Sequence, residues 1–361
     1  MNPIERALRG VDRLQQRHRA LAFLVAVQKK LGDDNGGTLI ANLTYSGFVT
    51  VFPLLLALVT ILGLVVGGSA RLTHQIETSA VSQFPIVGSK LAENIRALHR
   101  SSGAGLAFGL AGTIWGATSL GQTAMFTMAQ IWDVPGVSRP NFVARLWRAF
   151  AFLGVLGVSV TVAGFLSGFG LVGGHGLVGV AAEAASALVN VGSYLLSFRL
   201  LTPAMVRNRQ LVPGAIAAGI AWTAIEAAGG YLVARDLRHA SAVYGTFALV
   251  LGLLAWTYLA ARVAVYASEI NVVAAYRLSP RAIVQPPLTE ADRRSLALQI
   301  TENIRRPEQR VSVSFEEVTP PGDAGPHAAE TRDPSTPENA AGGEGGDSRP
   351  PRRKPSTRPT A

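Results

Sequence analysis

The sequence contains no cysteine, which excludes disulfide bonds, thiolate metal sites and cysteine nucleophiles together. It also lacks the glycine-rich phosphate loop, the dinucleotide-binding glycine fingerprint and the nucleophile elbow that many enzymes use. Its six histidines are scattered, and no two of them lie at metal-ligand spacing on one helix. We therefore expect no enzymatic activity, no bound metal ion and no cofactor.

Charged residues are also scarce, because they make up only 16% of the chain, whereas a water-soluble domain needs about a quarter. The mean hydropathy is positive, at +0.28. The apolar residues gather in runs such as 54–66, 149–162 and 246–255, separated by arginine-rich segments. This pattern indicates that hydrocarbon surrounds residues 39–271. The expected fold class is an all-α membrane protein with amphipathic flanking helices.

The number of transmembrane helices follows from the lengths of the apolar runs. A helix needs about 20 largely apolar residues to cross a bilayer, and six segments meet this requirement. The second segment contains Thr113, Ser119 and Gln122, so we expect it to face protein rather than lipid. The predicted transmembrane domain, 39–274, has spans at about 39–67, 105–131, 149–173, 177–201, 212–234 and 243–273, with an external loop at 68–104.

The distribution of Lys and Arg predicts the orientation of the chain. With a cytoplasmic N-terminus, and with residues after Arg294 left out, the inside segments hold 17 Lys and Arg and the outside segments hold six. Positively charged flanks stay in the cytoplasm, so we expect both termini to be cytoplasmic. The net charge of +10 then follows from topology, and we expect no specific nucleic-acid partner.

The two flanks of the transmembrane domain have different characters. Segment 1–38 is basic, and residues 1–32 form an amphipathic helical pattern of the kind that lies on anionic lipids. An alternative is a soluble helix that packs on the cytoplasmic face of the bundle. The tail, 275–361, is rich in Pro, Gly, Ser and Thr and is predicted to be disordered from about residue 305. The oligomeric state stays open, and a homo-oligomer is one option.

Ionisable residues within the predicted spans are costly in lipid and therefore point to function. Glu183 and Glu226 lie at similar depths in the fourth and fifth spans, where two carboxyl groups sharing a low-dielectric site would suit proton or cation coupling. The alternative is two unrelated buried acids, each protonated or hydrogen-bonded to a neighbour. Arg262 shares a face of the sixth span with Glu269, although it could simply reach to the interface. The candidates for a cavity or transport path are Glu183, Glu226, Tyr258, Arg262, Glu269 and Asn271.

Three stretches resemble a known family. The first, 41–55, ends in a Phe-Pro-Leu motif whose proline is expected to kink the first span, and the second, 114–132, begins with Ile-Trp. The third runs from a Tyr-Gly pair through Trp-x-Tyr to Glu-x-Asn. The residues concerned are Tyr45, Phe52, Pro53, Trp115, Tyr244, Gly245, Trp256, Glu269 and Asn271. Together they resemble the YihY/BrkB family of bacterial inner-membrane proteins over about residues 25–280.

The resemblance implies six spans, cytoplasmic termini and a place in the bacterial plasma (inner) membrane, and it makes Glu269 a family position. Members are linked to virulence and serum resistance, and an older ribonuclease label fits these residues badly. Our leading hypothesis is a transporter or lipid-translocating protein with intramembrane acids lining a cavity. The rival is an envelope scaffold that recruits partners through its external loop or tail. A ribonuclease would require metal-dependent RNA cleavage, which we do not expect.

Overall fold

The protein is built from helices, as the sequence predicts. A computed structural model describes residues 3–66, 102–136, 141–173 and 176–316, which belong to one compact unit, 1–318. A second unit, 319–361, lies outside the described residues, as does nearly all of the predicted external loop. The helices are α1 (Pro3–Arg17), α2 (Arg19–Asp33), α3 (Gly36–Val66), α6 (Ser102–Ile131), α7 (Phe142–Gly173), α8 (Leu177–Leu201), α9 (Asn208–Tyr276) and α10 (Glu290–Glu302).

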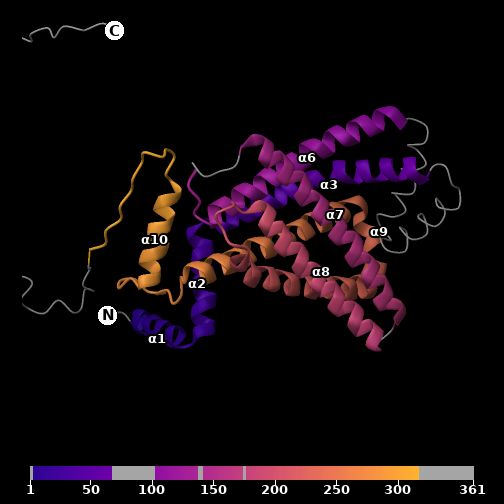
Figure 1. The fold of residues 1–361 in the computed structure, drawn as a ribbon. Coiled ribbons are helices and arrows are strands. Elements are labelled where there is room, and N and C mark those ends of the chain that lie inside the picture. The colour runs from indigo at the N-terminus through magenta and orange to yellow at the C-terminus, as the bar shows by residue number, and fades with distance from the viewer. Residues whose placement is uncertain (1–2, 67–101, 137–140, 174–175, 317–361) are drawn as a thin grey trace, which may run out of the picture. The chain divides into compact units, whose positions relative to one another are not determined.

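The long helices lie side by side in a bundle (Figure 1). α3 packs along α6, α6 along α7, α7 along α8 and α8 along α9, while α9 returns to α3 and so closes the ring. Small residues allow the closest approaches, because a Cβ atom at Gly219 of α9 would lie only 2.7 Å from the backbone nitrogen of Val191 in α8. Close backbone contact through small residues is how helices associate in lipid, where no hydrophobic effect drives them together.

Helix α9 folds back on itself. The rings of Trp222 and Trp256 lie 5.1 Å apart, and the Gly214 amide donates to Asn271 Oδ1 at 2.6 Å, although 34 and 57 residues separate the partners. In a straight helix 34 residues span about 50 Å, so the two halves of α9 must run antiparallel. We call these halves the first arm and the second arm. They correspond to the predicted spans 212–234 and 243–273.

The sequence-based prediction of a break between these spans differs from the structure, in which residues 235–242 remain helical. This stretch reads Arg-Asp-Leu-Arg-His-Ala-Ser-Ala and contains neither glycine nor proline. Alanine, leucine and arginine favour helix strongly, so nothing in the local sequence stops it. The reversal of direction therefore does not depend on a conventional loop.

Four described segments are long and apolar enough to cross a membrane: Gly36–Leu54, Phe142–Ser159, Gly179–Leu201 and Val250–Tyr276. They overlap the predicted first, third, fourth and sixth spans. Only 6% of the segment in α7 is buried, and apolar surface exposed on this scale is typical of contact with lipid or a partner. Within the described residues, α6 and the first arm contain no such segment, so the count of six spans stays a prediction.

The N-terminal segment forms two helices rather than the single amphipathic helix expected over 1–32, because the backbone is extended at His18. Gln15 donates to the carbonyl oxygen of Arg281 at 2.8 Å, and the Ile283 amide donates to Asp12 Oδ1 at 2.9 Å. Helix α1 is thus held to the bundle through its polar side. Its apolar side chains remain about half exposed, which leaves them free to contact lipid: Leu8, Val11 and Leu14.

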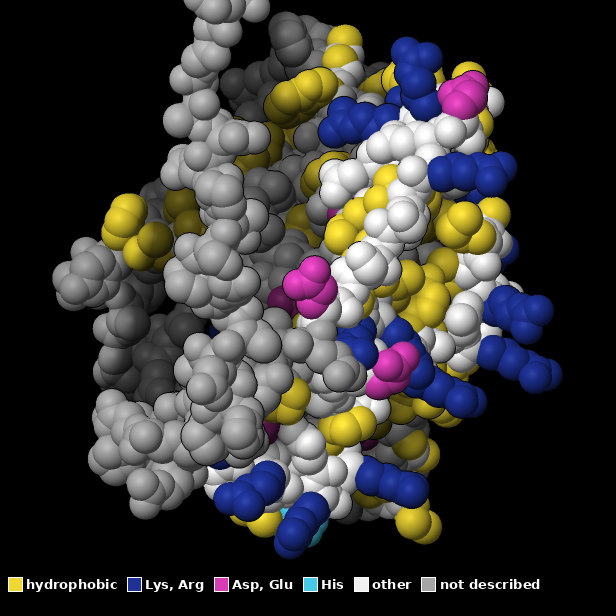
Figure 2. Space-filling model, turned by 90° about the vertical axis from the view of Figure 1, so that its left-hand side faces the viewer, with side chains coloured by type: hydrophobic (Ala, Val, Ile, Leu, Met, Phe, Trp, Pro, Cys, Tyr) yellow, Lys and Arg dark blue, Asp and Glu magenta, His cyan; other side chains and the backbone are white. Residues whose placement is uncertain are grey.

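The chain that follows α9 folds back onto α1 and α2. Arg281 is buried, and its guanidinium binds Asp292 at 2.8 Å and Asp33 at 2.5 Å, while Lys29 donates to the carbonyl oxygen of Ala282. Both flanks of the bundle therefore lie at the same end. Figure 2 shows that Lys and Arg side chains are prominent on this face. Past α10, residues 303–316 continue without a helix.

Candidate functional site

A buried cluster of charges lies where α2 meets the ends of α6 and α9. The Lys30 ammonium donates to both carboxylate oxygens of Asp34, to Oδ1 at 2.6 Å, and it lies 3.2 Å from Asp133 Oδ2. It also approaches the carbonyl oxygen of Ile131 at 3.4 Å. None of the three charged side chains is more than 2% exposed. Lys30 is therefore the central cation of this cluster.

Two left-handed residues bring the members of this cluster together. Asn35 has φ 53° and turns the chain from α2 into α3, one residue after Asp34. Asp133 itself has φ 49°, just after α6 ends at Ile131, so the chain reverses and places its carboxylate against Lys30. Asn and Asp tolerate this conformation better than other non-glycine residues. The helix ends, more than the helices themselves, build the cluster.

Helix α9 supplies a third carboxyl group to the cluster. Glu269 is completely buried, and Asp34 is the side-chain hydrogen-bond partner of its carboxyl group. Its neighbour Asn271, 1% exposed, accepts the Gly214 amide and so joins the two arms of α9. Two carboxyl groups form a hydrogen bond only when one of them holds a proton. The cluster holds three carboxyl groups and one ammonium group.

The excess of acids keeps protons in the cluster. Burial raises the pKa of Asp133 to about 7, against the lowering effect of Lys30. Burial also raises the pKa of Asp34 above its usual value, although Lys30 opposes the shift. For Lys30, burial favours the neutral form, but the carboxylates of Asp34, Asp133 and Glu269 outweigh it and raise its pKa. Lys30 therefore stays charged, while Asp133 gains or loses its proton near neutral pH.

We expect the stability of the protein to fall as the pH rises from about 4 to about 7. In this window the folded state keeps a proton on Asp133 that the unfolded chain, with a pKa of about 3.9, has already released. Above about pH 7 both states are ionised and the slope vanishes. Between about pH 4 and pH 7 the free energy of unfolding should decrease by at most on the order of 4 kcal/mol. Thermal unfolding in detergent between pH 4.5 and 8 measures it.

The matched variants for this measurement are Asp133→Asn and Glu308→Gln. Asp133→Asn should make the profile shallower, because one of the groups that bind a proton is gone while Asp34 keeps its raised pKa. Glu308 is exposed, so Glu308→Gln should keep the wild-type profile. A slope that is identical in wild type and Asp133→Asn would show that another group binds the proton.

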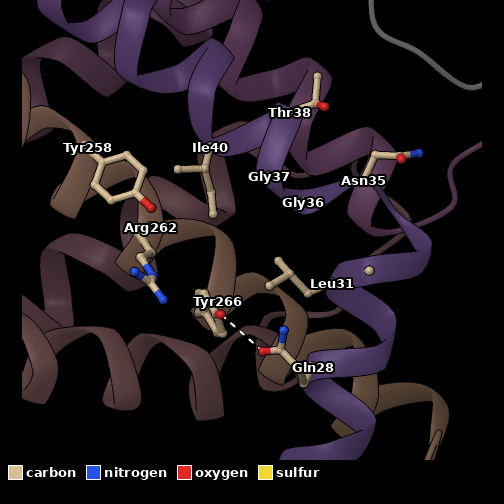
Figure 3. A pocket seen from close by; sticks show the side chains of 11 residues that line it. Gln28, Leu31, Asn35, Gly36, Gly37, Thr38, Ile40, Tyr258, Arg262 and Tyr266 are labelled. Carbon is tan, nitrogen blue, oxygen red and sulfur yellow. Dashed lines mark hydrogen bonds between the residues drawn. The ribbon is translucent and has the colours of Figure 1, made fainter.

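A pocket of about 450 Å³ opens beside the cluster, between α2, the start of α3 and the second arm of α9 (Figure 3). The Tyr266 hydroxyl donates to Gln28 Oε1 at 3.1 Å across this pocket. The Arg262 guanidinium lies over the Tyr266 ring, 5.6 Å from its centroid. Pockets of about 300–1,000 Å³ are large enough for small ligands. The lining residues are Gln28, Leu31, Gly32, Asn35, Gly36, Gly37, Thr38, Ile40, Tyr258, Arg262 and Tyr266.

Comparison with known proteins decides the family. The family model described as virulence factor BrkB matches residues 27–290, which is most of the chain. The chain belongs to the BrkB family. Two relatives, both described as UPF0761 membrane proteins, come from Stenotrophomonas maltophilia strains R551-3 and K279a. Each is 28% identical over 291 residues, which cover 78% of this chain and 67% of the relative. No solved structure matches the chain significantly.

This BrkB-family chain is thus a membrane protein, and Glu183 and Glu226 fit the alternative of two unrelated acids rather than the shared site. Glu226 accepts hydrogen bonds from Asn190 of α8 at 3.0 Å and from Trp222 at 2.8 Å. Glu183 is exposed and lies seven residues before Asn190, about 10 Å along α8. The structure does not bring the two glutamates together, because Asn190 occupies the level where Glu183 was expected. Neither glutamate lines the described pocket.

Other family-motif residues hold helices together or lie at the surface. Pro53 lies inside α3, and its carbonyl oxygen accepts a hydrogen bond from Thr113 of α6 at 3.0 Å. A side chain at Gly112 would meet the Pro53 ring, so this proline joins α3 to α6 and does not line the described pocket. Trp256 packs against Trp222 between the arms. Tyr45, Phe52 and Trp115 are exposed, whereas Tyr244 and Gly245 lie in α9 with side chains outside the described set.

Sequence analysis found Glu269, Arg262 and Tyr258 but missed Lys30, Asp34 and Asp133. The missed residues lie outside the predicted spans, where charged residues are ordinary. One signal was available, because a turn with two aspartates ends α2 four residues after its lysine pair and favours an i, i+4 ion pair. Nothing in the sequence pointed to Asp133, which reaches Lys30 only through its left-handed backbone.

Proposed function

We propose that this BrkB-family protein translocates a lipid across the bilayer. One observation carries the proposal: Arg262 and Tyr258, which line the pocket, are exposed on a segment able to cross the membrane, Val250–Tyr276. Polar side chains exposed there suit a substrate that arrives from the bilayer rather than from water. A lipid is such a substrate, because its headgroup needs polar partners while its acyl chains stay in hydrocarbon.

The buried cluster supports a role for protons in this movement. Leu31 lines the pocket, and its neighbour Lys30 lies in the cluster. Arg262 and Glu269 are two turns apart on the second arm, about 10 Å along the helix. Proton binding to the cluster thus acts on two helices that also form the pocket. The groups that face it are Lys30, Asp34, Asp133, Glu269 and Tyr276, with Gln299 and Glu302 from α10.

We also propose that the end carrying α1 and α10 faces the cytoplasm of a bacterial cell and that its basic residues contact anionic lipids. The basic side chains on this face support both statements (Figure 2). Glu308→Cys tests the orientation, because the natural chain has no cysteine and Glu308 is exposed in the stretch after α10. A membrane-impermeant thiol reagent should label it in inverted vesicles and not in intact spheroplasts. The opposite pattern would refute this orientation.

Lipid movement can be measured in reconstituted vesicles that contain phosphatidylglycerol with a fluorophore on one acyl chain. Wild-type protein should bring inner-leaflet label to an external quencher at a rate that changes several-fold between pH 6 and pH 8. Asp133→Asn should remove this pH dependence, because Asn cannot exchange a proton at the position whose pKa lies near 7. A rate no higher than that of protein-free vesicles at every pH would refute lipid translocation.

Glu183→Gln is the matched control for this experiment. It likewise replaces a carboxyl group by an amide, but Glu183 is exposed on α8 and lies outside both the pocket and the cluster. Its transport rate and pH dependence should equal those of the wild type. If both variants lose pH dependence equally, the cluster has no special role in proton coupling.

A further inference from the structure

We propose that the pocket between α2, α3 and the second arm binds the phosphate of an anionic phospholipid. Its use as a substrate site rests on the proposed translocation, whereas the binding itself does not. Among the residues that the structure describes, eleven line this pocket, and they include one arginine and neither aspartate nor glutamate. Arg262 is thus the one formally charged side chain among these lining residues, although the buried cluster next to the pocket is rich in carboxyl groups.

Arg262 supplies the charge of the site. Its side chain is exposed within a segment able to cross the membrane, where an arginine without an anionic partner is costly. Among the described residues no ion pair involves Arg262, and its hydrogen-bonding partners are the neutral hydroxyl groups of Tyr258 and Tyr266. Stacking over the Tyr266 ring holds the planar guanidinium in place. A phosphate is the anion that this fork of donors fits best.

The start of α3 supplies a second set of donors. The first N–H groups of a helix have no intrahelical partner, and they carry the positive end of the helix dipole. Here the Asn35 carbonyl oxygen accepts the amides of Thr38 and Leu39, which leaves those of Gly36 and Gly37 as donors for a ligand. Both glycines line the pocket and lie across it from Arg262 (Figure 3). An anion between them would meet positive potential on two sides.

The shape of the pocket favours a headgroup. Its volume of about 450 Å³ accommodates a phosphate with its glycerol, and a side chain built at Gly37 or Gly32 would enter open space. Leu31 and Ile40 add apolar walls to a site otherwise lined by Gln28, Thr38 and the tyrosines. Polar donors next to apolar walls match the junction of headgroup and acyl chain. A free phosphate ion is also an anion, but it has no apolar part that could contact Leu31 and Ile40.

Binding of phosphatidylglycerol to the full chain in neutral detergent tests the site. The readouts are the number of lipids retained in native mass spectrometry and the rise of the thermal midpoint with lipid concentration. Arg262→Gln should weaken phosphatidylglycerol binding by about tenfold, because it removes a charge-assisted contact. Gly37→Leu should weaken it similarly by filling the pocket, and its open surroundings let the variant fold.

Arg199→Gln is the matched control, because Arg199 is an exposed arginine in the last turn of α8 and does not line the pocket. It should bind phosphatidylglycerol like the wild type. Equal weakening by Arg199→Gln and Arg262→Gln would mean diffuse attraction and would overturn the site. Equal binding of phosphatidylcholine would overturn the preference for an anionic lipid. Inorganic phosphate that stabilises the wild type as well as phosphatidylglycerol does would overturn the assignment to a lipid.

These measurements separate the site from the proposed function, because binding in detergent needs no movement across a bilayer. Intact binding with no lipid movement in vesicles would refute translocation alone. Unchanged binding in Arg262→Gln and Gly37→Leu, with active movement in the wild type, would refute this site alone.

Discussion

Replacing Lys30 by methionine should destabilise the protein by about 3–5 kcal/mol, the usual result of removing one partner from a buried ion pair. The variant keeps the length of the side chain but leaves Asp34, Asp133 and Glu269 without their central cation. At about 2–4 °C per kcal/mol, the thermal midpoint in detergent should drop on the order of 10 °C. The drop should be larger at pH 8 than at pH 5, because at low pH the carboxyl groups are neutralised by protons.

Lys29→Met is the matched control, since the neighbouring Lys29 side chain is 25% exposed. The distance from its ammonium nitrogen to Asp292 Oδ1 is 3.6 Å, which is longer than the ion-pair distances of Lys30. We expect Lys29→Met to reduce the free energy of unfolding by about 1 kcal/mol or less, which is typical when a partly exposed ion pair is removed. Adding Asp34→Asn to Lys30→Met should recover part of the loss by removing one orphaned carboxylate. If Lys30→Met and Lys29→Met behave alike at pH 8, the cluster does not stabilise the fold as we infer.

Gly214→Ala should separate the two arms of α9. A Cβ atom at this position would overlap the backbone carbonyl oxygen of Ala267 and lie 2.6 Å from Asn271 Nδ2. A backbone atom cannot move aside cheaply, so overpacking should cost about 1–3 kcal/mol beyond the gain in helix propensity. The change also displaces the amide that Asn271 binds. A lower thermal midpoint and loss of a single monodisperse species in detergent would show the effect.

Gly252→Ala is the natural comparison, because Gly252 lies in the second arm with nothing within 4 Å of a Cβ atom. Exchange of glycine for alanine inside a helix favours folding by about 1 kcal/mol, so this variant should be neutral or more stable. The two substitutions are chemically identical and should have effects of opposite sign. A neutral Gly214→Ala variant would mean that the arms do not approach as closely as described.

The helical character of the protein could be predicted because bilayer thickness and backbone hydrogen bonding limit what an apolar run of 20 residues can do. The turn between α2 and α3 was also readable, since Asp33-Asp34-Asn35-Gly36-Gly37 interrupts the helical pattern. The two predicted spans 212–234 and 243–273 already implied a reversal of direction between them. The helical conformation of 235–242 was not predicted, because the sequence analysis treated this stretch as a connection between spans.

Residues of the candidate site could be recognised in the sequence only where an ionisable residue lies within an apolar segment. Glu269 lies in such a run and was found. Lys30 and Lys29 look alike in the sequence, although Lys30 is fully buried and Lys29 is not. A shared site for Glu183 and Glu226 was suggested by their similar depth in the two spans, but Asn190, about 10 Å along the same face of α8, lies beside Glu226 instead. Depth counted from the ends of apolar runs does not fix how far one helix is shifted along another.

The amino-acid sequence alone determined that the chain is a membrane protein and that it is helical. It also showed which polar residues lie within apolar segments, where their insertion into lipid is costly. These properties follow from composition and periodicity, which act locally. Only the tertiary structure decided that Lys30, Asp34, Asp133 and Glu269 meet and that Arg262 faces the start of α3 across an open pocket. These tertiary contacts depend on how the helices pack and where their ends turn. Local sequence patterns do not reveal contacts between residues that are more than two hundred positions apart.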